Sequence, residues 1–178
     1  MIEEIVMCSE SSILFPSASD PAPRSTCSVR RATPDDLPAA IELVNEYFQA
    51  IDVWIRDTES EFSDYLLGDD RGVWLAFAGK EAVGCIVLHP LVSLPGSGEI
   101  KRLYVKPAYR RQGLAEDLLQ ALEEFAAKTA SYEWLYLDSK DDLVTAIPFY
   151  ERQGYEHCDR YNANPQATVF MRKRLAGA

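Results

Sequence analysis

Apolar residues recur three or four positions apart in two stretches of the chain, which is the spacing of a helix that buries one face. The first stretch predicts a helix that begins at Pro34 after the N-cap Thr33, and its apolar face consists of Leu37, Ile41, Val44, Phe48 and Ile51. The second predicts a long helix with Gly113 in its first turn, and its apolar face consists of Leu114, Leu118, Leu119, Leu122, Phe125 and Ala126. Two more helices are predicted at 58–68, where Thr58-x-x-Glu61 matches a capping box, and at 143–153 before Gly154.

Short apolar runs between turn residues predict seven strands. They cover 29–32, 73–78, 82–91, 100–105, 134–138, 155–160 and 168–173. The predicted order is therefore β-α-α-β-β-β-α-β-α-β-β. This is an α/β (α+β) layered fold with a mixed, mostly antiparallel central sheet and helices on both faces, in which the strand, helix and strand around Gly113 form a parallel unit.

The stretch that joins the central strand to the long helix reads EIKRLYVKPAYRRQGLA from Glu99 to Ala115. It holds five cations in eleven positions with no acid among them, in a chain of formal net charge −10: Lys101, Arg102, Lys106, Arg110 and Arg111. The first amides of a helix have no internal partner, and a glycine lets a ligand approach the main chain. The stretch predicts an anion site for a phosphate ester, with a basic solvated turn as the alternative.

Arg110-x-x-Gly113-x-Ala115, after a strand that ends Leu103-Tyr104-Val105, resembles the acyl-CoA pyrophosphate loop of the GNAT superfamily of N-acyltransferases. The resemblance runs from about residue 28 to the C-terminus. It implies that the loop binds the pyrophosphate of acetyl-CoA and that main-chain amides of the strand bind the pantetheine arm. A β-bulge would free those amides, and the mixed faces of the strand are compatible with one. The implied donor-binding residues are Leu103, Tyr104, Val105, Arg110, Arg111, Gln112, Gly113, Leu114 and Ala115.

A second segment, AIPFYERQGY at 146–155, is similar to the family pattern Ala-x-x-Phe-Tyr-x-x-x-Gly-Phe, with Tyr155 in place of the phenylalanine. The resemblance implies that Tyr150 lies near the cofactor sulfur and acts as the general acid toward the departing thiolate. A phenol, with a pKa near ~10, stays protonated at neutral pH and suits that role. The spacing alone favours a different interpretation, in which Tyr150 is a buried aromatic residue of a helix.

Attack on a thioester requires a neutral amine, and therefore a group that can accept its proton. Glu99 opens the central strand, where family members often place such a carboxylate, and it is the candidate base. A solvent-facing charge beside Gly98 is an equally good interpretation of Glu99. Asp138 is a lesser candidate, and His89 and His157 are set aside as polar residues at strand ends.

The composition fits one soluble domain of 178 residues, with 28 acids against 18 bases, which disfavours nonspecific nucleic-acid binding. No apolar run is long enough for a membrane span, and the N-terminus lacks a basic signal region. The four cysteines, at 8, 27, 85 and 158, show no C-x-x-C pair or metal-ligand spacing, so we expect free thiols in a reducing cytosol and no metal. Residues 1–27 are a leader of unknown role, and 28–178 form the acyltransferase domain.

The sequence thus predicts a cytoplasmic N-acetyltransferase, a monomer or homodimer, that moves an acetyl group from acetyl-CoA to a primary amine of a small molecule or peptide by direct transfer in a ternary complex. The alternative is a noncatalytic acyl-CoA-binding or regulatory module with the same fold. A nucleotide-binding protein of another fold lacks support, because the chain has no G-x-x-x-x-G-K-[ST] loop and no G-x-G-x-x-G after the first strand. The acceptor loops carry no readable motif, which leaves the identity of the amine open.

Overall fold

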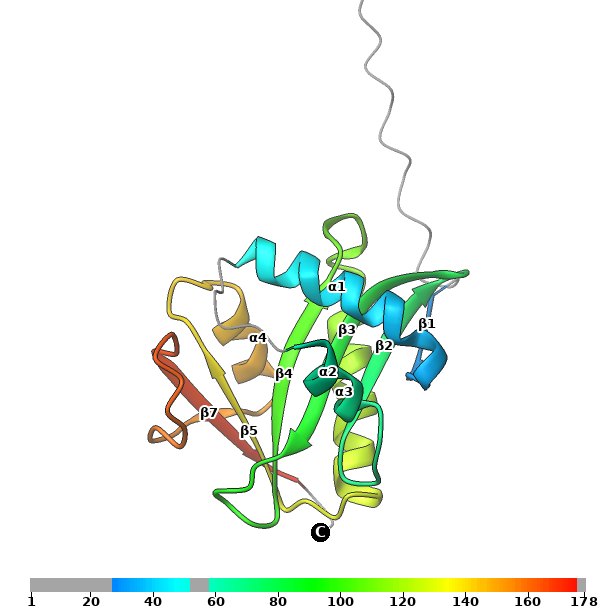
Figure 1. The fold of residues 1–178 in the computed structure, drawn as a ribbon. Coiled ribbons are helices and arrows are strands. Elements are labelled where there is room, and N and C mark those ends of the chain that lie inside the picture. The colour runs from blue at the N-terminus through cyan, green and yellow to red at the C-terminus, as the bar shows by residue number, and fades with distance from the viewer. Residues whose placement is uncertain (1–26, 52–57, 176–178) are drawn as a thin grey trace, which may run out of the picture.

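The computed structural model describes residues 27–51 and 58–175, and its helices and strands follow the order that the sequence predicts (Figure 1). The strands are β1 (Cys27–Arg31), β2 (Gly72–Ala78), β3 (Glu81–Pro90), β4 (Ser97–Val105), β5 (Trp134–Ser139), β6 (Glu156–His157) and β7 (Val169–Arg174). The helices are α1 (Leu37–Ala50), α2 (Glu59–Tyr65), α3 (Leu114–Lys128) and α4 (Ala146–Arg152), with 3-10 helices at Pro34–Asp36 and Pro107–Tyr109. The predicted leader, except Cys27, and the loop at 52–57 lie outside the described residues.

The seven strands of the described residues form one sheet in the order β1-β2-β3-β4-β5-β7-β6. Neighbouring strands are antiparallel except β4 and β5, which run parallel. The chain passes from β4 to β5 through α3, because parallel neighbours need a long crossover connection. The predicted mixed, mostly antiparallel sheet with one parallel unit is therefore confirmed.

Each face of the sheet has its own hydrophobic core. One core packs under α1 and α2, where Leu43 and Phe48 are buried, and the other packs under α3 and α4, where Leu118 and Leu122 are buried. Figure 1 shows α1 and α2 in front of the sheet, with α3 behind it. Truncating one of these buried leucines to alanine typically costs about 2–5 kcal/mol. Among the described residues, no helix has the length and apolar character that crossing a membrane requires.

Hydrogen bonds between side chains and the main chain stabilise the predicted beginnings of the two helices on the α1 side of the sheet. The Thr33 amide donates to Asp36 at 2.8 Å, and the Arg30 guanidinium bonds to the same carboxylate, which holds the pKa of Asp36 well below its usual range. At α2, the Thr58 amide donates to Glu61 at 2.8 Å and Thr58 Oγ1 accepts from the Glu61 amide at 3.2 Å. Both signals in the sequence therefore mark real helix starts.

Among the boundaries that differ from the prediction, three bear on the loop before α3 and on the C-terminal part of the sheet. Gly113 is not in the first turn of α3 but is its N-cap, because its φ of +84° belongs to the left-handed region and cannot continue into a right-handed helix. α4 begins at Ala146 rather than 143, which leaves Pro148 in its first turn, where a missing amide is tolerated. β6 is two residues long rather than six, although the Cys158 amide after it still donates to the Phe170 carbonyl of β7 at 2.9 Å.

A β-bulge interrupts β4 at Arg102, whose φ is +57°. On either side of the bulge, β3 and β4 are paired through Cys85–Tyr104 and Val87–Lys101, so β4 has one extra residue between these pairs. The extra residue shifts the alternation of side chains: Ile100 and Val105 belong to the core under α3, whereas Tyr104 belongs to the core under α1. The bulge therefore explains why apolar residues do not simply alternate with polar ones in the sequence of β4.

Candidate active site

β4 and β5 separate halfway along their length. Their parallel pairing runs from Ser97–Trp134 to Ile100–Leu137 and stops there, although both strands continue. Figure 1 shows the two strands spreading apart toward their carboxyl ends. The second half of β4 thus has an edge that no described strand covers.

The main-chain amides of Leu103 and Val105 face this uncovered edge. The amide of Lys106, the next residue, donates to the Val83 carbonyl on β3 at 2.8 Å. Successive main-chain groups of a strand point in opposite directions, so those of Val105 and Leu103 point away from β3. The Val105 carbonyl accepts a bond from Arg110 Nε at 2.9 Å. The two amides remain as donors toward the space between β4 and β5.

A cavity of about 460 Å³ opens where the strands separate. Its walls come from α1, β4, β5, α4 and the segment at 162–167, and its volume is typical of a small-molecule site. The two predicted catalytic residues, Tyr150 and Glu99, both line this cavity, and so does Leu103. The other predicted donor-binding residues do not line it. Tyr104 and Val105 lie further along β4. The turn before α3 holds Arg110, Arg111, Gln112 and Gly113, and Leu114 and Ala115 are the first residues of α3.

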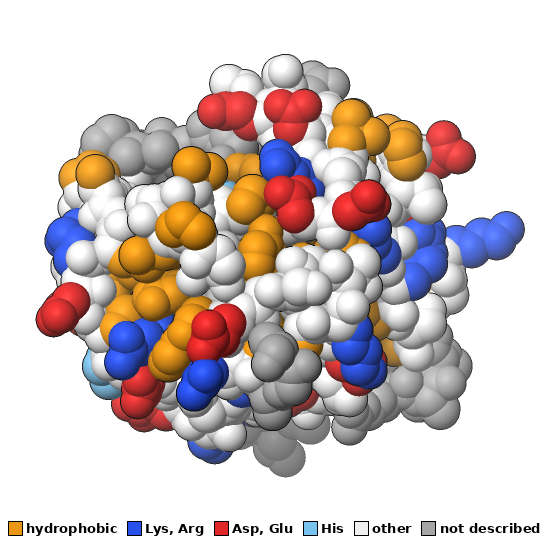
Figure 2. Space-filling view, turned by 90° about the horizontal axis from the view of Figure 1, so that it is seen from below, with side chains coloured by type: hydrophobic (Ala, Val, Ile, Leu, Met, Phe, Trp, Pro, Cys, Tyr) orange, Lys and Arg blue, Asp and Glu red, His pale blue; other side chains and the backbone are white. Residues whose placement is uncertain are grey.

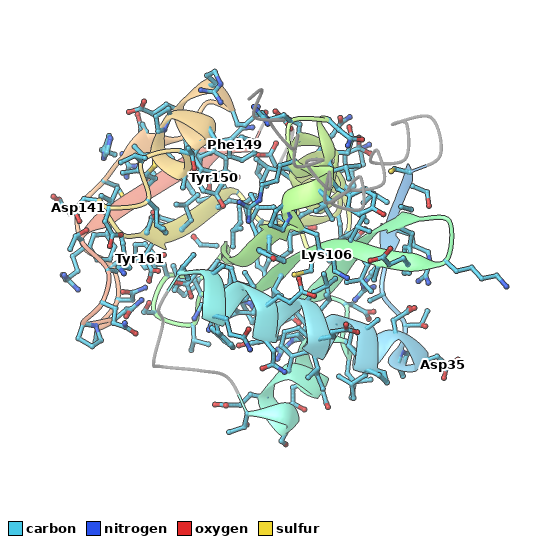
Figure 3. The ribbon with its side chains drawn as sticks, turned by 90° about the horizontal axis from the view of Figure 1, so that it is seen from above. Asp35, Lys106, Asp141, Phe149, Tyr150 and Tyr161 are labelled. Carbon is cyan, nitrogen blue, oxygen red and sulfur yellow. The ribbon has the colours of Figure 1, made fainter. Side chains whose placement is uncertain are left out.

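Tyr150 is held between two rings and is only 7% exposed. Its ring packs edge-on against Phe149 at 5.1 Å and Tyr155 at 5.4 Å between centroids, and Figure 3 shows it on α4. Burial, and then the nearby Tyr47 hydroxyl, raise the pKa of Tyr150 far above its usual value near 10. The phenol therefore stays protonated and can donate a hydrogen bond into the cavity.

Glu99 is 3% exposed and has four partners that use both of its oxygens. Oε1 accepts from the Tyr161 hydroxyl at 2.8 Å and from Asn162 Nδ2 at 2.9 Å. Oε2 lies 2.9 Å from His89 Nε2 and 3.4 Å from Lys101 Nζ. Burial alone would raise the pKa of Glu99, but the close contact with His89 and the charge of Lys101 outweigh burial and lower the pKa to about 2.

Asp138 lies beside Glu99 on the cavity wall but has different partners. Asn162 Nδ2 donates to its Oδ2 at 2.6 Å, and Asn164 Nδ2 lies 3.2 Å from the same oxygen. Asn162 therefore joins the two carboxylates. Within the described residues, amides are the groups that bond to Asp138, whereas Glu99 also has two basic neighbours.

The N-terminus of α3 has no side-chain cap, and Gly113 is followed directly by the helix. Arg110 and Arg111 are exposed at this turn, and Arg111 also has a left-handed φ of +61°. Gln112 Oε1 is buried, with no hydrogen-bond partner in the part of the chain that the structure describes. Unsatisfied main-chain donors beside two arginines fit an anion such as a phosphate.

The five cations of the stretch from Lys101 to Arg111 lie in four places. Lys101 pairs with Glu99, and the Arg102 guanidinium lies over the Phe48 ring at 4.9 Å on the α1 side. Lys106 Nζ pairs with Glu81 at 3.0 Å and with Glu46 at 3.6 Å. The five cations therefore do not converge on one site, because Lys101 pairs with Glu99 of its own strand, whereas the bulge and the carboxylates of α1 and β3 hold Arg102 and Lys106 away from the turn before α3. Arg110 and Arg111 are the two that lie at the turn before α3.

Sequence reasoning missed four residues of this region, Tyr47, Tyr161, Asn162 and Asn164, and it set aside a fifth, His89. His89 faces Glu99 directly in the β3–β4 register, so a correct hairpin register would have found it. Tyr161 contacts Tyr136 at 5.1 Å and Phe170 at 5.6 Å between ring centroids, which anchors its segment to the sheet. The asparagines precede β7 in a stretch without a regular pattern, and no signal in the sequence marks them.

The three cysteines in the described residues, Cys27, Cys85 and Cys158, are free thiols, as expected. Cys85 is fully buried and its Sγ bonds to the Arg102 carbonyl at 3.3 Å. Burial raises its pKa to about 12, so the thiol stays protonated and is a poor nucleophile.

The face of the molecule seen in Figure 2 carries acidic, basic and hydrophobic side chains side by side. No continuous basic surface covers this face, in keeping with the net charge of −10. That charge pattern gives no support to nonspecific binding of nucleic acid through this face.

Comparison with known proteins places these features in a family. Residues 37–155 match the model of the acetyltransferase (GNAT) family. An uncharacterized N-acetyltransferase of Schizosaccharomyces pombe is 30% identical over 150 residues, which cover 80% of this chain and 91% of that protein. The structure of a GNAT-family acetyltransferase from Staphylococcus aureus superposes with a TM-score of 0.73 at 17% identity, covering 84% of this chain and 99% of that one. The PaiA N-acetyltransferase of Thermoplasma acidophilum, determined in complex with coenzyme A, gives 0.69 at 19% identity, with 83% and 98% covered.

Proposed function

This chain belongs to the acetyltransferase (GNAT) family and is an acyltransferase, and on that premise we propose that it transfers an acetyl group from acetyl-CoA to a primary amine by direct transfer in a ternary complex. The observation that carries the proposal is the separation of β4 from β5 beyond Ile100, which opens a cavity beside Tyr150. A donor and an acceptor can both reach the space between the two strands. The acceptor would be a small molecule or a peptide.

The residues at the turn before α3 fit the phosphates of the proposed donor. Arg110 to Ala115 would hold the pyrophosphate with helix amides and two arginines, and the amides of Leu103 and Val105 would hold the pantetheine arm. A coenzyme A complex of a protein with the same fold supports a donor of this type. Acetyl-CoA supplies an acetyl group already activated as a thioester. The protein therefore needs to orient the reactants, stabilise the departing thiolate and accept the proton that the amine nitrogen loses.

Tyr150 is the proposed donor to the departing sulfur. When the new C–N bond forms, the C–S bond breaks and the sulfur becomes a thiolate, which takes up a proton. A thiol has a pKa of ~8.5, well below that of the buried phenol. Tyr150 therefore stabilises the thiolate by a hydrogen bond from its protonated hydroxyl and is not ionised beforehand.

Glu99 is the proposed base, and its low pKa limits when it can act. A lysine-like ammonium has a pKa of ~10.4, so proton transfer to a carboxylate with a pKa of about 2 is strongly unfavourable before attack. The attacking species is therefore the fraction of the amine that has already lost one proton to solvent. Once the nitrogen is bonded to the acyl carbon, its N–H becomes far more acidic. Glu99, or a water that it orients, would accept the proton at that stage.

A steady-state assay of free coenzyme A release tests the proposal. The full chain is incubated with acetyl-CoA and a panel of primary amines, and mass spectrometry identifies the acetylated products. We expect release that depends on the amine. Thermal stabilisation by acetyl-CoA without turnover on any amine would instead favour the noncatalytic acyl-CoA-binding module.

A further inference from the structure

The wall of the cavity that faces α1 carries charges of both signs. Leu135 and Leu137 of β5 belong to the core under α3, so Asp138, the next residue in the alternation, points to the α1 side. Lys140 follows β5 and reaches the end of α1, where its Nζ lies 3.5 Å from the Ile51 carbonyl. Arg102 lines the same cavity from β4. A carboxylate and two cations therefore face one space.

Asp138 is a carboxylate on this wall whose hydrogen-bond partners, in the part of the chain that the structure describes, are all neutral. Lys101 offsets the charge of Glu99 from 3.4 Å, whereas Asp138 bonds to the neutral amides of Asn162 and Asn164 within the described residues. These amides fix the orientation of the Asp138 carboxylate without neutralising it. Asp138 is therefore the group on this wall best suited to attract an ammonium.

Lys140 is the cation most available to a ligand. Its nearest carboxylate is Asp142 at 3.2 Å, but the Asp142 side chain is 63% exposed and does not line the cavity. An ion pair with a partner exposed to water to this degree is worth little. A ligand anion inside the cavity can therefore compete with Asp142 for Lys140.

We propose that the acceptor is a small amphoteric molecule, an amine that also carries a carboxylate, with its amino end at Asp138 and its carboxylate at Lys140. The inference rests on the acetyl-transfer function proposed above. A simple amine would meet Asp138 but would leave Lys140 and Arg102 facing it with the same sign of charge. An amphoteric acceptor satisfies both ends, and a cavity of about 460 Å³ holds a molecule of amino-acid size.

The test compares matched ligands on the full chain saturated with coenzyme A. Calorimetry measures the binding of amino acids and of the amines that lack only the carboxylate: phenylalanine and phenethylamine, histidine and histamine, β-alanine and ethylamine. We expect at least one amphoteric member to bind about tenfold more tightly than its partner, the usual value of a charge-assisted hydrogen bond. Lys140→Gln should abolish this preference without weakening the binding of the simple amine, because it removes a charge of the same sign as the ammonium, whereas Asp138→Asn should weaken the binding of both ligands.

Two control variants remove the same kinds of charge elsewhere. Asp35 is exposed at the opposite end of α1 from Tyr161 (Figure 3), and Lys128 pairs with Glu124 on the outer face of α3. Asp35→Asn and Lys128→Gln should bind every ligand as the unmodified chain does. If simple amines bind as tightly as their amphoteric partners across the panel, or if Lys140→Gln keeps the preference, the inference is wrong.

The outcome also separates this inference from the proposed function. Amine acetylation by acetyl-CoA without any preference for amphoteric acceptors would overturn the inference and support the transfer reaction. Tight amphoteric binding that depends on Lys140 and Asp138, without any acetylated product, would support the inferred ligand class and overturn the transfer reaction.

Discussion

The turn before α3 and the cavity wall at Asp138 are built in opposite ways. The turn is one continuous stretch, and its proposed ligand contacts are main-chain amides that a left-handed Gly113 exposes. The wall is assembled from α1, β4, β5 and the segment before β7, and it acts through side chains. Main-chain amides can bind the phosphates of the donor whatever most of the side chains are. A wall made of side chains binds a different acceptor when those side chains change. We therefore expect changes in the turn to affect donor binding alone, and changes in the wall to affect acceptor binding alone.

The largest effect should be on acetyl-CoA binding, when a side chain is added at the turn before α3. Gly113→Glu places a side chain and a negative charge where phosphates would approach the α3 amides, so acetyl-CoA binding should fall by more than about 1000-fold. Calorimetry measures this directly, and circular dichroism shows whether the fold is kept.

Gly96→Glu is the matched control, because Gly96 has a similar φ of +78° and open space around its position. Both variants carry the strain of a left-handed glutamate, roughly 1–2 kcal/mol. The Gly96 variant should bind acetyl-CoA normally. Equal loss of binding in the two variants would show that backbone strain, rather than the phosphate contact, is responsible.

The same contrast explains what the sequence could predict. The strand order, the hairpins and the helix starts follow from short-range patterns, and Thr33 and Thr58 mark their helices through local hydrogen bonds. The turn before α3 is also local, so its motif is visible in a single stretch. The division of the five cations was not predictable in this way, because it depends on a bulge at Arg102 and on carboxylates from other elements.

The wall was harder to predict for a physical reason. Asn162 lies 24 residues after Asp138 and 63 after Glu99, and it bonds to both only because the segment before β7 folds back over the diverging strands. No spacing rule connects such residues. Glu99 and Tyr150 were predicted through resemblance, and the structure places both on one cavity, but their catalytic roles stay predictions.

The next effect in size should come from Tyr150→Phe, which removes the proposed donor to the thiolate and keeps the ring. General acid assistance typically contributes about 10²–10⁴-fold, so turnover should fall by at least about 100-fold, while the dissociation constant of acetyl-CoA changes by less than about twofold. Tyr155→Phe is the control, since its hydroxyl bonds to Glu123 at 2.9 Å and does not line the cavity. If the Tyr150→Phe variant kept full turnover, the proposed role of Tyr150 as the donor to the thiolate would be wrong.

A smaller effect should follow from Asn162→Ala, which deletes the amide that joins Glu99 and Asp138 at 2.9 and 2.6 Å. Loss of charge-assisted bonds frees Asp138 to reorient, so the KM for the amine should rise about tenfold without a change in acetyl-CoA binding. Asn45→Ala, at an exposed position of α1, is the control and should leave both constants unchanged. A parallel loss of donor affinity would mean that the turn and the wall are not independent.

The smallest effect should come from Lys101→Gln, which removes one cation 3.4 Å from Glu99. The pKa of Glu99 is lowered to about 2 in the folded chain, so its ion pairs stabilise the fold above the unfolded-state pKa, and this contribution is lost as the pH falls through about 2. Without Lys101 the folded-state pKa rises. The free energy of unfolding in urea should therefore drop by about 0.5–1 kcal/mol at pH 7, and the difference from the unmodified chain should shrink toward pH 2. Lys128→Gln, which breaks an exposed pair on α3, gives the baseline. A difference that stays constant between pH 7 and pH 2 would show that Lys101 stabilises the fold by packing and not through the charge of Glu99.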